Sequence, residues 1–113
     1  YKEFFLDNPK VIWRPVSDWC KSVHWLSTIT LRNASLRDPL LKYMKEKGVD
    51  CRQMVYPVHM AFPYKDKNNP DDYPVSNSIS LRSLHLPSSL GLSDNNQQKI
   101  SDLIQDWLEH NDC

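Results

Sequence analysis

The side chains with the widest chemical range in this sequence are its cysteines and histidines, and their spacing limits what they can do. Cys20 and His24 are separated by three residues, and Cys51 and His59 lie further along the chain. No pair has the Cys-Xaa-Xaa-Cys spacing of a structural zinc site, and Cys20 and His24 fall on a predicted loop and strand rather than on one helical face. We therefore expect isolated thiols and imidazoles, and no metal site.

A nucleophilic Cys–His pair can be drawn in any chain that holds several residues of both types, but no helix begins directly after a cysteine to activate its thiol. Gly48 and Gly91 are the only glycines, so the sequence has no glycine-rich loop for a phosphate or a dinucleotide. The cysteines, Cys20, Cys51 and Cys113, are odd in number and widely spaced, which is typical of free thiols in a reducing cytosol.

The segment from Tyr56 to Tyr64 is the best candidate for a binding site. It opens a long loop, and long loops in compact domains are often functional. His59 is the polar group in an apolar, proline-stiffened stretch, so its imidazole could donate to a phosphate or a sugar hydroxyl. Arg52 lies on the predicted strand that leads in, and could bind an anion through its guanidinium. The alternative is that the apolar side chains simply pack on a core or on a partner subunit: Tyr56, Met60, Phe62 and Tyr64.

Composition excludes several classes of partner. The chain has 113 residues, a formal net charge of zero and 40% hydrophobic residues, as one compact globular domain would. The charge balance offers no basic excess to displace counterions from nucleic acid. No apolar run approaches the ~20 residues that a membrane-spanning helix needs. We therefore expect no nucleic-acid partner and no membrane association.

Four stretches are predicted to be strands. Pro15 places the first at an edge or near a strand end, and Pro57 ends the third. The second is the clearest, because its β-branched residues alternate and place Trp25 on the same face as Ile29 and Leu31. The third is predicted to be a core strand. The predicted strands are Val11–Trp13, His24–Leu31, Asp50–Tyr56 and Leu84–Leu86.

Helices are predicted between these strands. The first six residues read as the end of a helix already under way. Asp38 can cap the next helix with Pro39 in its first position, or Ser35 can start it a turn earlier, and Gly48 ends it. Pro74 opens a short helix over residues 75–82. Ser93 caps a final helix whose apolar stripe is Ile100, Leu103, Ile104, Trp107 and Leu108.

This order of elements predicts one α+β domain over residues 1–113: a small mixed or antiparallel sheet of about three to four strands, covered by helices. The sequence begins with Tyr1 rather than Met. We therefore expect the chain to be a C-terminal piece of a longer protein, cut near a domain boundary.

Five passages, in order, resemble the C-terminal domain of the DegT/DnrJ-type sugar aminotransferases that depend on pyridoxal phosphate (PLP), particularly the perosamine synthase-like members. Each passage is weak alone, but the five together cover nearly the whole chain. They are Ser22–Leu31, Arg37–Leu41 with Lys47-Gly48-Val49, Cys51–Tyr64 with its Tyr-Pro-Val-His start, Pro74–Ser89 ending in Leu-Pro-Ser-Ser, and Leu92-Ser93 with the last helix.

The resemblance implies the small domain of a fold-type-I enzyme that is a cytoplasmic homodimer when complete. Such enzymes use PLP to move an amino group from glutamate to a nucleotide-linked keto-sugar. Their PLP-binding lysine lies in a large domain upstream, so this chain is expected neither to bind PLP covalently nor to be active alone. By position, the resemblance implies substrate contacts, with the last two weaker: His59, Arg52, Trp25, Tyr56 and Met60. The alternative function is a non-catalytic binding or interaction domain of the same fold.

Overall fold

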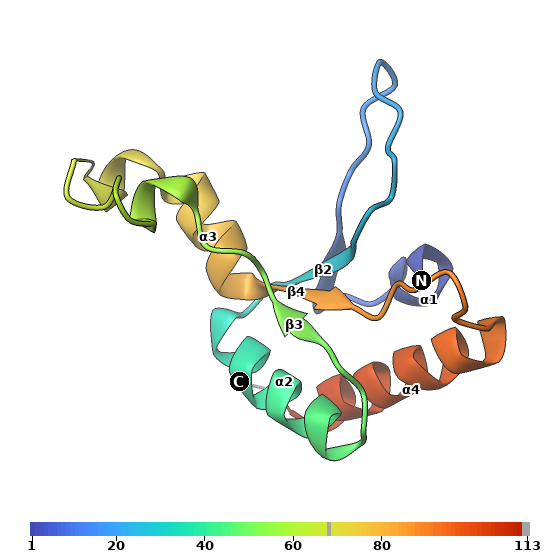
Figure 1. The fold of residues 1–113 in the computed structure, drawn as a ribbon. Coiled ribbons are helices and arrows are strands. Elements are labelled where there is room, and N and C mark those ends of the chain that lie inside the picture. Colours follow the sequence, from blue (N-terminus) through green and yellow to red (C-terminus); the bar gives the residue numbers. More distant parts are fainter. Residues whose placement is uncertain (68, 112–113) are drawn as a thin grey trace.

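The computed structural model describes residues 1–67 and 69–111 and is built around a four-stranded antiparallel sheet in the order β1-β2-β4-β3 (Figure 1). Ile29 of β2 lies opposite Trp13 of β1 on one side and Leu84 of β4 on the other. The predicted α+β class and small antiparallel sheet are confirmed. The strands are β1 (Val11–Trp13), β2 (Ser27–Leu31), β3 (Arg52–Gln53) and β4 (Ser83–Leu86).

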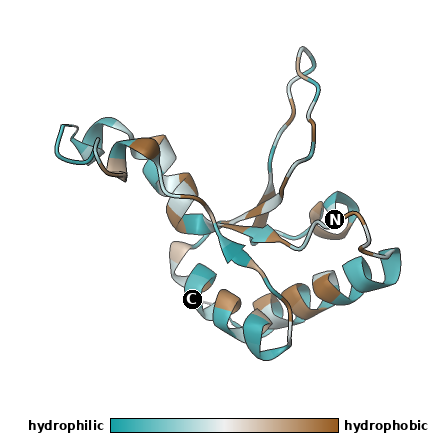
Figure 2. Cartoon of the chain, viewed as in Figure 1, coloured by the Kyte–Doolittle hydropathy of each residue, from teal (hydrophilic) through white to brown (hydrophobic). Residues whose placement is uncertain are grey.

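Helices α2 and α4 cover one face of this sheet (Figure 1). Hydrophobic and hydrophilic residues alternate along α4, as a helix with one buried face requires (Figure 2). The helices are α1 (Lys2–Phe5), α2 (Arg37–Glu46), α3 (Pro74–Arg82) and α4 (Asp94–His110). Between sheet and helices lies the core, where each buried side chain contributes about 1.5–3 kcal/mol: Phe5, Val11, Ile29, Leu31, Leu36, Leu40, Met44, Leu84, Leu86, Ile100, Ile104 and Leu108.

The opposite face of the sheet is polar. Thr30 Oγ1 lies 2.8 Å from Ser83 Oγ, and Thr28 Oγ1 lies 2.8 Å from His85 Nδ1. Both β4 residues are buried, and burial lowers the pKa of His85. Within the described part of the chain, His85 Nε2 is the one buried side-chain polar atom without a hydrogen-bond partner. These two side-chain hydrogen bonds thus add to the backbone pairing between the two central strands.

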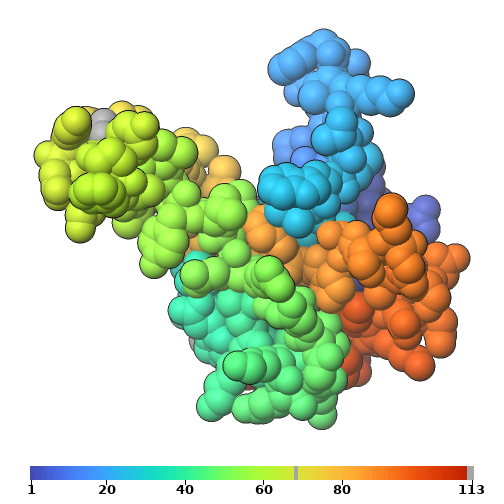
Figure 3. Space-filling view, in the orientation of Figure 1, coloured from blue at the N-terminus to red at the C-terminus, as the bar shows by residue number. Residues whose placement is uncertain are grey.

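Two segments project from this body. The first arm, residues 14–26, is the long connection between β1 and β2. The second arm, residues 54–67 and 69–82, contains two short 3₁₀ turns, Val58–Met60 and Pro70–Asp72, and ends with α3. In the space-filling view both arms stand clear of the body (Figure 3). The sheet and helices α1, α2 and α4 therefore form a packed unit, called the body below, to which the arms are attached at the sheet.

The second and third strands are shorter in the structure than the sequence predicted. His24 has a φ of +50°, so the second strand begins only at Ser27. Trp25 accordingly lies on the first arm, 80% exposed, and not on the core face of the sheet. The third strand is not a core strand: Arg52 and Gln53 are exposed at the sheet edge. It stops because Met54 N donates to Ser83 O, after which β4 gives way to α3 and offers no further partners.

The predicted helix boundaries are mostly confirmed. Ser93 caps α4 by accepting from Asn96 N, Pro74 opens α3, and Gly48 follows α2 with a φ of +77°. The prediction that Asp38 caps this helix is wrong. Asn33 Oδ1 instead accepts from Ser35 N and starts a 3₁₀ turn that runs into α2, which confirms the earlier start. In the stripe of α4, Leu103 and Trp107 are only half-buried; the other three residues are buried.

Candidate functional site

The second arm is held together by His59, which is only 8% exposed. Its Nε2 lies 2.8 Å from Asn77 Oδ1 on α3, and its ring stacks on Tyr73 with the ring centroids 4.2 Å apart. Asn77 Nδ2 in turn donates to Pro70 O at 2.7 Å. A single imidazole thus connects the 3₁₀ turn at residues 58–60 to the start of α3.

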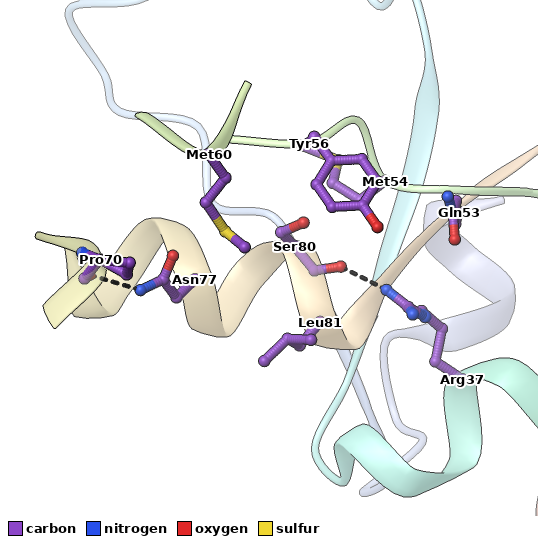
Figure 4. A pocket seen from close by; sticks show the side chains of 9 residues that line it. All are labelled: Arg37, Gln53, Met54, Tyr56, Met60, Pro70, Asn77, Ser80 and Leu81. Atoms are coloured by element: carbon purple, nitrogen blue, oxygen red, sulfur yellow. Dashed lines mark hydrogen bonds between the residues drawn. The ribbon is translucent and has the colours of Figure 1, made fainter. Parts of the chain in front are cut away.

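A pocket of about 270 Å³ lies between α3 and the chain that leaves β3. Figure 4 shows Tyr56 above α3, with its hydroxyl group turned toward the end of the pocket where Arg37 and Gln53 lie. Mostly apolar walls with a few polar groups are typical of sites for small organic molecules. The volume suits one ring or sugar of a larger ligand. The lining residues are Arg37, Gln53, Met54, Tyr56, Met60, Pro70, Asn77, Ser80 and Leu81.

Arg37 fixes the base of this pocket. Its side chain is 13% exposed, its Nε donates to Asp38 Oδ1 at 2.8 Å, and its Nη1 donates to Ser80 O at 2.7 Å (Figure 4). The Asp38 carboxylate balances the guanidinium charge, and the bond to Ser80 ties α3 to the start of α2. Arg37 therefore positions the second arm against the body and leaves one guanidinium nitrogen available to a ligand.

The structure brings together three of the five residues expected to contact substrate. Tyr56 and Met60 line the pocket, and His59 lines a neighbouring hollow with Tyr64 and Tyr73. The other two lie elsewhere. Arg52 is on β3, paired with Asp50 at 3.1 Å, with its side chain 78% exposed. Trp25 is on the first arm, so neither it nor Arg52 lines the pocket.

Seven of the nine pocket residues were not predicted from sequence, among them the polar residues Arg37, Asn77 and Ser80. Arg37 and Asp38 stand in a passage that carried the family resemblance, and that passage was the only signal that could have identified the arginine. Asn77 and Ser80 are small polar residues on the weakly amphipathic α3. Nothing in their spacing distinguishes them from a solvated helix face.

The remaining reactive side chains are dispersed. Among the described residues, no three His, Cys, Asp or Glu side chains lie close enough together to hold a metal ion. Burial and then the charge of Asp50 raise the pKa of Cys51 to about 12, so its thiol stays protonated. Cys20 is exposed on the first arm, and Cys113 lies outside the described residues. No helix in the described ranges is long and apolar enough to cross a membrane.

The described lysines do not fit a covalent PLP site. Such a site needs a lysine in a pocket beside groups that hold the phosphate and the pyridine nitrogen. All lysines except Lys10 are exposed, and Lys10 Nζ donates to Leu108 O at the end of α4. No chemical step through PLP can therefore be assigned to the side chains that the structure describes.

Apolar side chains on the arms are unusually exposed. Among the described residues, every exposed large hydrophobic side chain except Leu6 and Leu90 lies on one of the two arms. Where such exposed apolar side chains form a contiguous patch, they typically mark contacts with other protein or with ligand. On the first arm these residues are Val16, Trp19, Val23 and Trp25; on the second they are Val55, Tyr56, Val58, Met60, Phe62, Tyr64, Tyr73, Val75, Ile79 and Leu81.

Known proteins resemble this chain in both sequence and fold. GDP-perosamine synthase of Vibrio cholerae is 30% identical over 87 residues, which are 75% of this chain and 24% of that protein. GDP-perosamine synthase of Escherichia coli O157:H7 is 27% identical over 84 residues, which are 74% of this chain and 22% of that protein. The chain thus spans about a quarter of the length of these relatives.

Solved structures share the fold over almost the whole chain. DesV from S. venezuelae matches with a TM-score of 0.85 at 21% identity, covering 98% of this chain and 30% of that protein. A DegT/DnrJ/EryC1/StrS aminotransferase from Brucella abortus matches with a TM-score of 0.77 at 27% identity, covering 94% and 28%. The model of that same family matches residues 1–105. With nearly all of its residues matched, the chain belongs to the DegT/DnrJ/EryC1/StrS aminotransferase family.

Proposed function

We propose that this chain is the small C-terminal domain of a PLP-dependent aminotransferase that transfers an amino group from glutamate to a nucleotide-linked keto-sugar. The family match and the names of the two curated relatives support this reaction class. PLP, bound by a large upstream domain, would carry the amino group between the two substrates. The complete enzyme is proposed to be a cytoplasmic homodimer.

The observation that carries the proposal is the second arm. Its segment around His59 is held rigidly, borders a pocket with apolar walls, and exposes aromatic side chains that the body leaves uncovered. Rigid positioning of a polar group beside apolar surface is what a substrate-binding wall requires. His59, Tyr56 and Met60 are the proposed substrate contacts on this arm. Arg52 and Trp25 remain proposed contacts that would depend on the neighbouring domain or subunit.

The chain alone is proposed not to bind PLP covalently, because the described lysines do not lie in a suitable pocket. Mixing the 113-residue chain with PLP should leave the cofactor's absorbance unchanged, and no amino transfer from glutamate should follow. A lasting spectral shift that persists through dialysis and localises to one lysine by mass spectrometry would show that the chain holds a cofactor site of its own.

The substrate role of the second arm is tested in the complete enzyme by His59→Ala. Removal of a contact to the sugar nucleotide should raise KM for that substrate by at least tenfold, about 1.4 kcal/mol of binding. KM for glutamate should change much less. His110→Ala, an exposed histidine on α4, is the matched control and should change neither constant. Equal rises in both constants for His59→Ala would count against a contact to the sugar nucleotide.

A non-catalytic binding domain of the same fold is the second candidate, favoured by the lack of a suitably placed lysine among the described residues. The sequence encoded before Tyr1 would distinguish between the two functions. A large domain that contains a buried lysine in a strand context would support the enzyme. A coding sequence that supplies no such domain would support the binding module.

A further inference from the structure

The hydrogen bonds around Asn77 determine which nitrogen of His59 carries the proton. Pro70 O can only accept a hydrogen bond, so the amide nitrogen of Asn77, 2.7 Å away, must face it. The amide oxygen must then face His59 Nε2, at 2.8 Å. Because an amide oxygen can only accept, Nε2 must donate. The neutral imidazole of His59 is therefore the Nε2–H tautomer, which leaves a lone pair on Nδ1.

The other ring nitrogen reaches the surface. No described residue forms a hydrogen bond with His59 Nδ1. Among the described residues, the one buried side-chain polar atom without a partner is His85 Nε2. His59 Nδ1 has no hydrogen-bond partner within the described ranges and is not in that class, so it is accessible to solvent. The ring lines a hollow with Pro57, Val58, Tyr64, Tyr73 and Ser76. His59 thus presents a lone pair from a ring that is otherwise buried and stacked.

We propose that Asn77 is a positioning residue that fixes His59 as the Nε2–H tautomer, so that Nδ1 accepts a hydrogen bond from a hydroxyl or N–H group of the bound ligand. This reverses the role expected from sequence, in which the imidazole donates to a phosphate or a hydroxyl. The identity of the ligand as a nucleotide sugar rests on the proposed function. The tautomer does not, because it follows from Asn77 and Pro70 alone.

The tautomer is measured by ¹⁵N NMR of the 113-residue chain at about pH 8.5, well above the ordinary histidine pKa of about 6.5. His59 should show a pyridine-like shift at Nδ1 and a pyrrole-like shift at Nε2. Asn77→Ala should move both signals toward the average of the two tautomers. Asn95→Ala, at an exposed position on α4, is the matched control and should change nothing. A wild-type Nδ1–H tautomer, or an Asn77→Ala spectrum identical to wild type, would overturn the assignment.

A second variant keeps the test decisive if Asn77→Ala loosens the arm. Asn77→Asp retains an acceptor oxygen for Nε2–H but loses the donor to Pro70 O. It should therefore keep the Nε2–H tautomer even if the arm moves. If Asn77 only supported the structure of the second arm, both variants would lose the Nε2–H tautomer to the extent that the arm unfolds. That result would contradict the proposal.

The acceptor role is tested with two probes at the same pH. GDP-mannose offers sugar hydroxyls and should shift the Nδ1 resonance, whereas inorganic sulfate, which carries no proton at this pH, offers only acceptors and should leave it unchanged. A shift with sulfate would mean that His59 donates to oxyanions and would overturn the proposal. No shift with either probe would refute a hydroxyl contact at Nδ1. In that case the tautomer assignment would still stand on its own measurement, separate from the proposed function.

Discussion

The body and the two arms of this domain use apolar side chains in opposite ways. In the body, Leu40 on α2 and Ile104 on α4 are completely buried between helices and sheet. On the arms, Trp19 is 89% exposed and Phe62 is 83% exposed. The body thus contains a buried hydrophobic core, whereas the arms leave large apolar side chains exposed. One short chain therefore combines a packed core with exposed apolar segments.

Chain geometry explains the difference. Apolar residues in the body recur with helical or strand periodicity, so each element places them on one face. In the second arm, Pro57, Pro63 and Pro70 interrupt any regular period before α3, and the apolar residues are left exposed. A short arm without a second layer cannot bury them. Such segments are ordered by a few specific contacts, here those of His59 and Arg37.

Matched leucines should show the largest contrast between the two regions. Leu40→Ala removes a fully buried side chain from α2 and should lower the free energy of unfolding by about 2–5 kcal/mol. Leu81→Ala removes a side chain that is 57% exposed on α3 and should change it by less than about 0.5 kcal/mol. Urea denaturation of the two variants measures the difference. Similar losses for both would mean that the second arm belongs to the core.

The cysteines offer a smaller contrast, in reactivity rather than stability. The Cys51 pKa of about 12, raised from 9.0, lowers its thiolate fraction about a thousandfold near pH 8. The Cys51 thiolate is more nucleophilic because its pKa is higher, which offsets part of that loss. Alkylation of Cys51 should still be about thirtyfold slower than that of a thiol with the ordinary pKa. Iodoacetamide should therefore modify the exposed Cys20 of the first arm well before Cys51 of the body. Peptide mapping by mass spectrometry separates the sites, and comparable rates would show that the body opens readily.

The body could be predicted well from sequence because local signals and tertiary packing agree there. Ser93 and Gly48 mark helix ends where the structure has them, and the α4 stripe correctly identified the core residues Ile100, Ile104 and Leu108. The start of β2 and both ends of β3 could not be predicted. His24 breaks the alternation of β2 through a left-handed backbone, and β3 ends when its partner β4 becomes helical. The first cause is a local backbone conformation and the second is tertiary, and neither is visible in residue types.

The candidate site was only partly predictable. His59, Tyr56 and Met60 stood out because they form a polar and apolar cluster in one proline-rich segment. Arg37 and Asn77 come from distant positions, and only folding brings them to the same pocket. The orientation of His59 was also hidden, because it depends on Pro70 O acting through Asn77. Sequence therefore located the loop, and the structure supplied its partners.

The most direct test of the contrast between body and arms is hydroxyl-radical footprinting of the isolated chain and of the complete enzyme that is proposed to contain it. Trp25 and Phe62, 80% and 83% exposed, should react readily in the isolated chain and be protected severalfold in the complete enzyme. Trp107 of α4, already half-buried against Tyr43, should react equally in both and serves as the internal control. Equal oxidation of Trp25 and Phe62 in the two proteins would contradict the proposed role of the arms, because their apolar side chains would then stay uncovered in the complete enzyme.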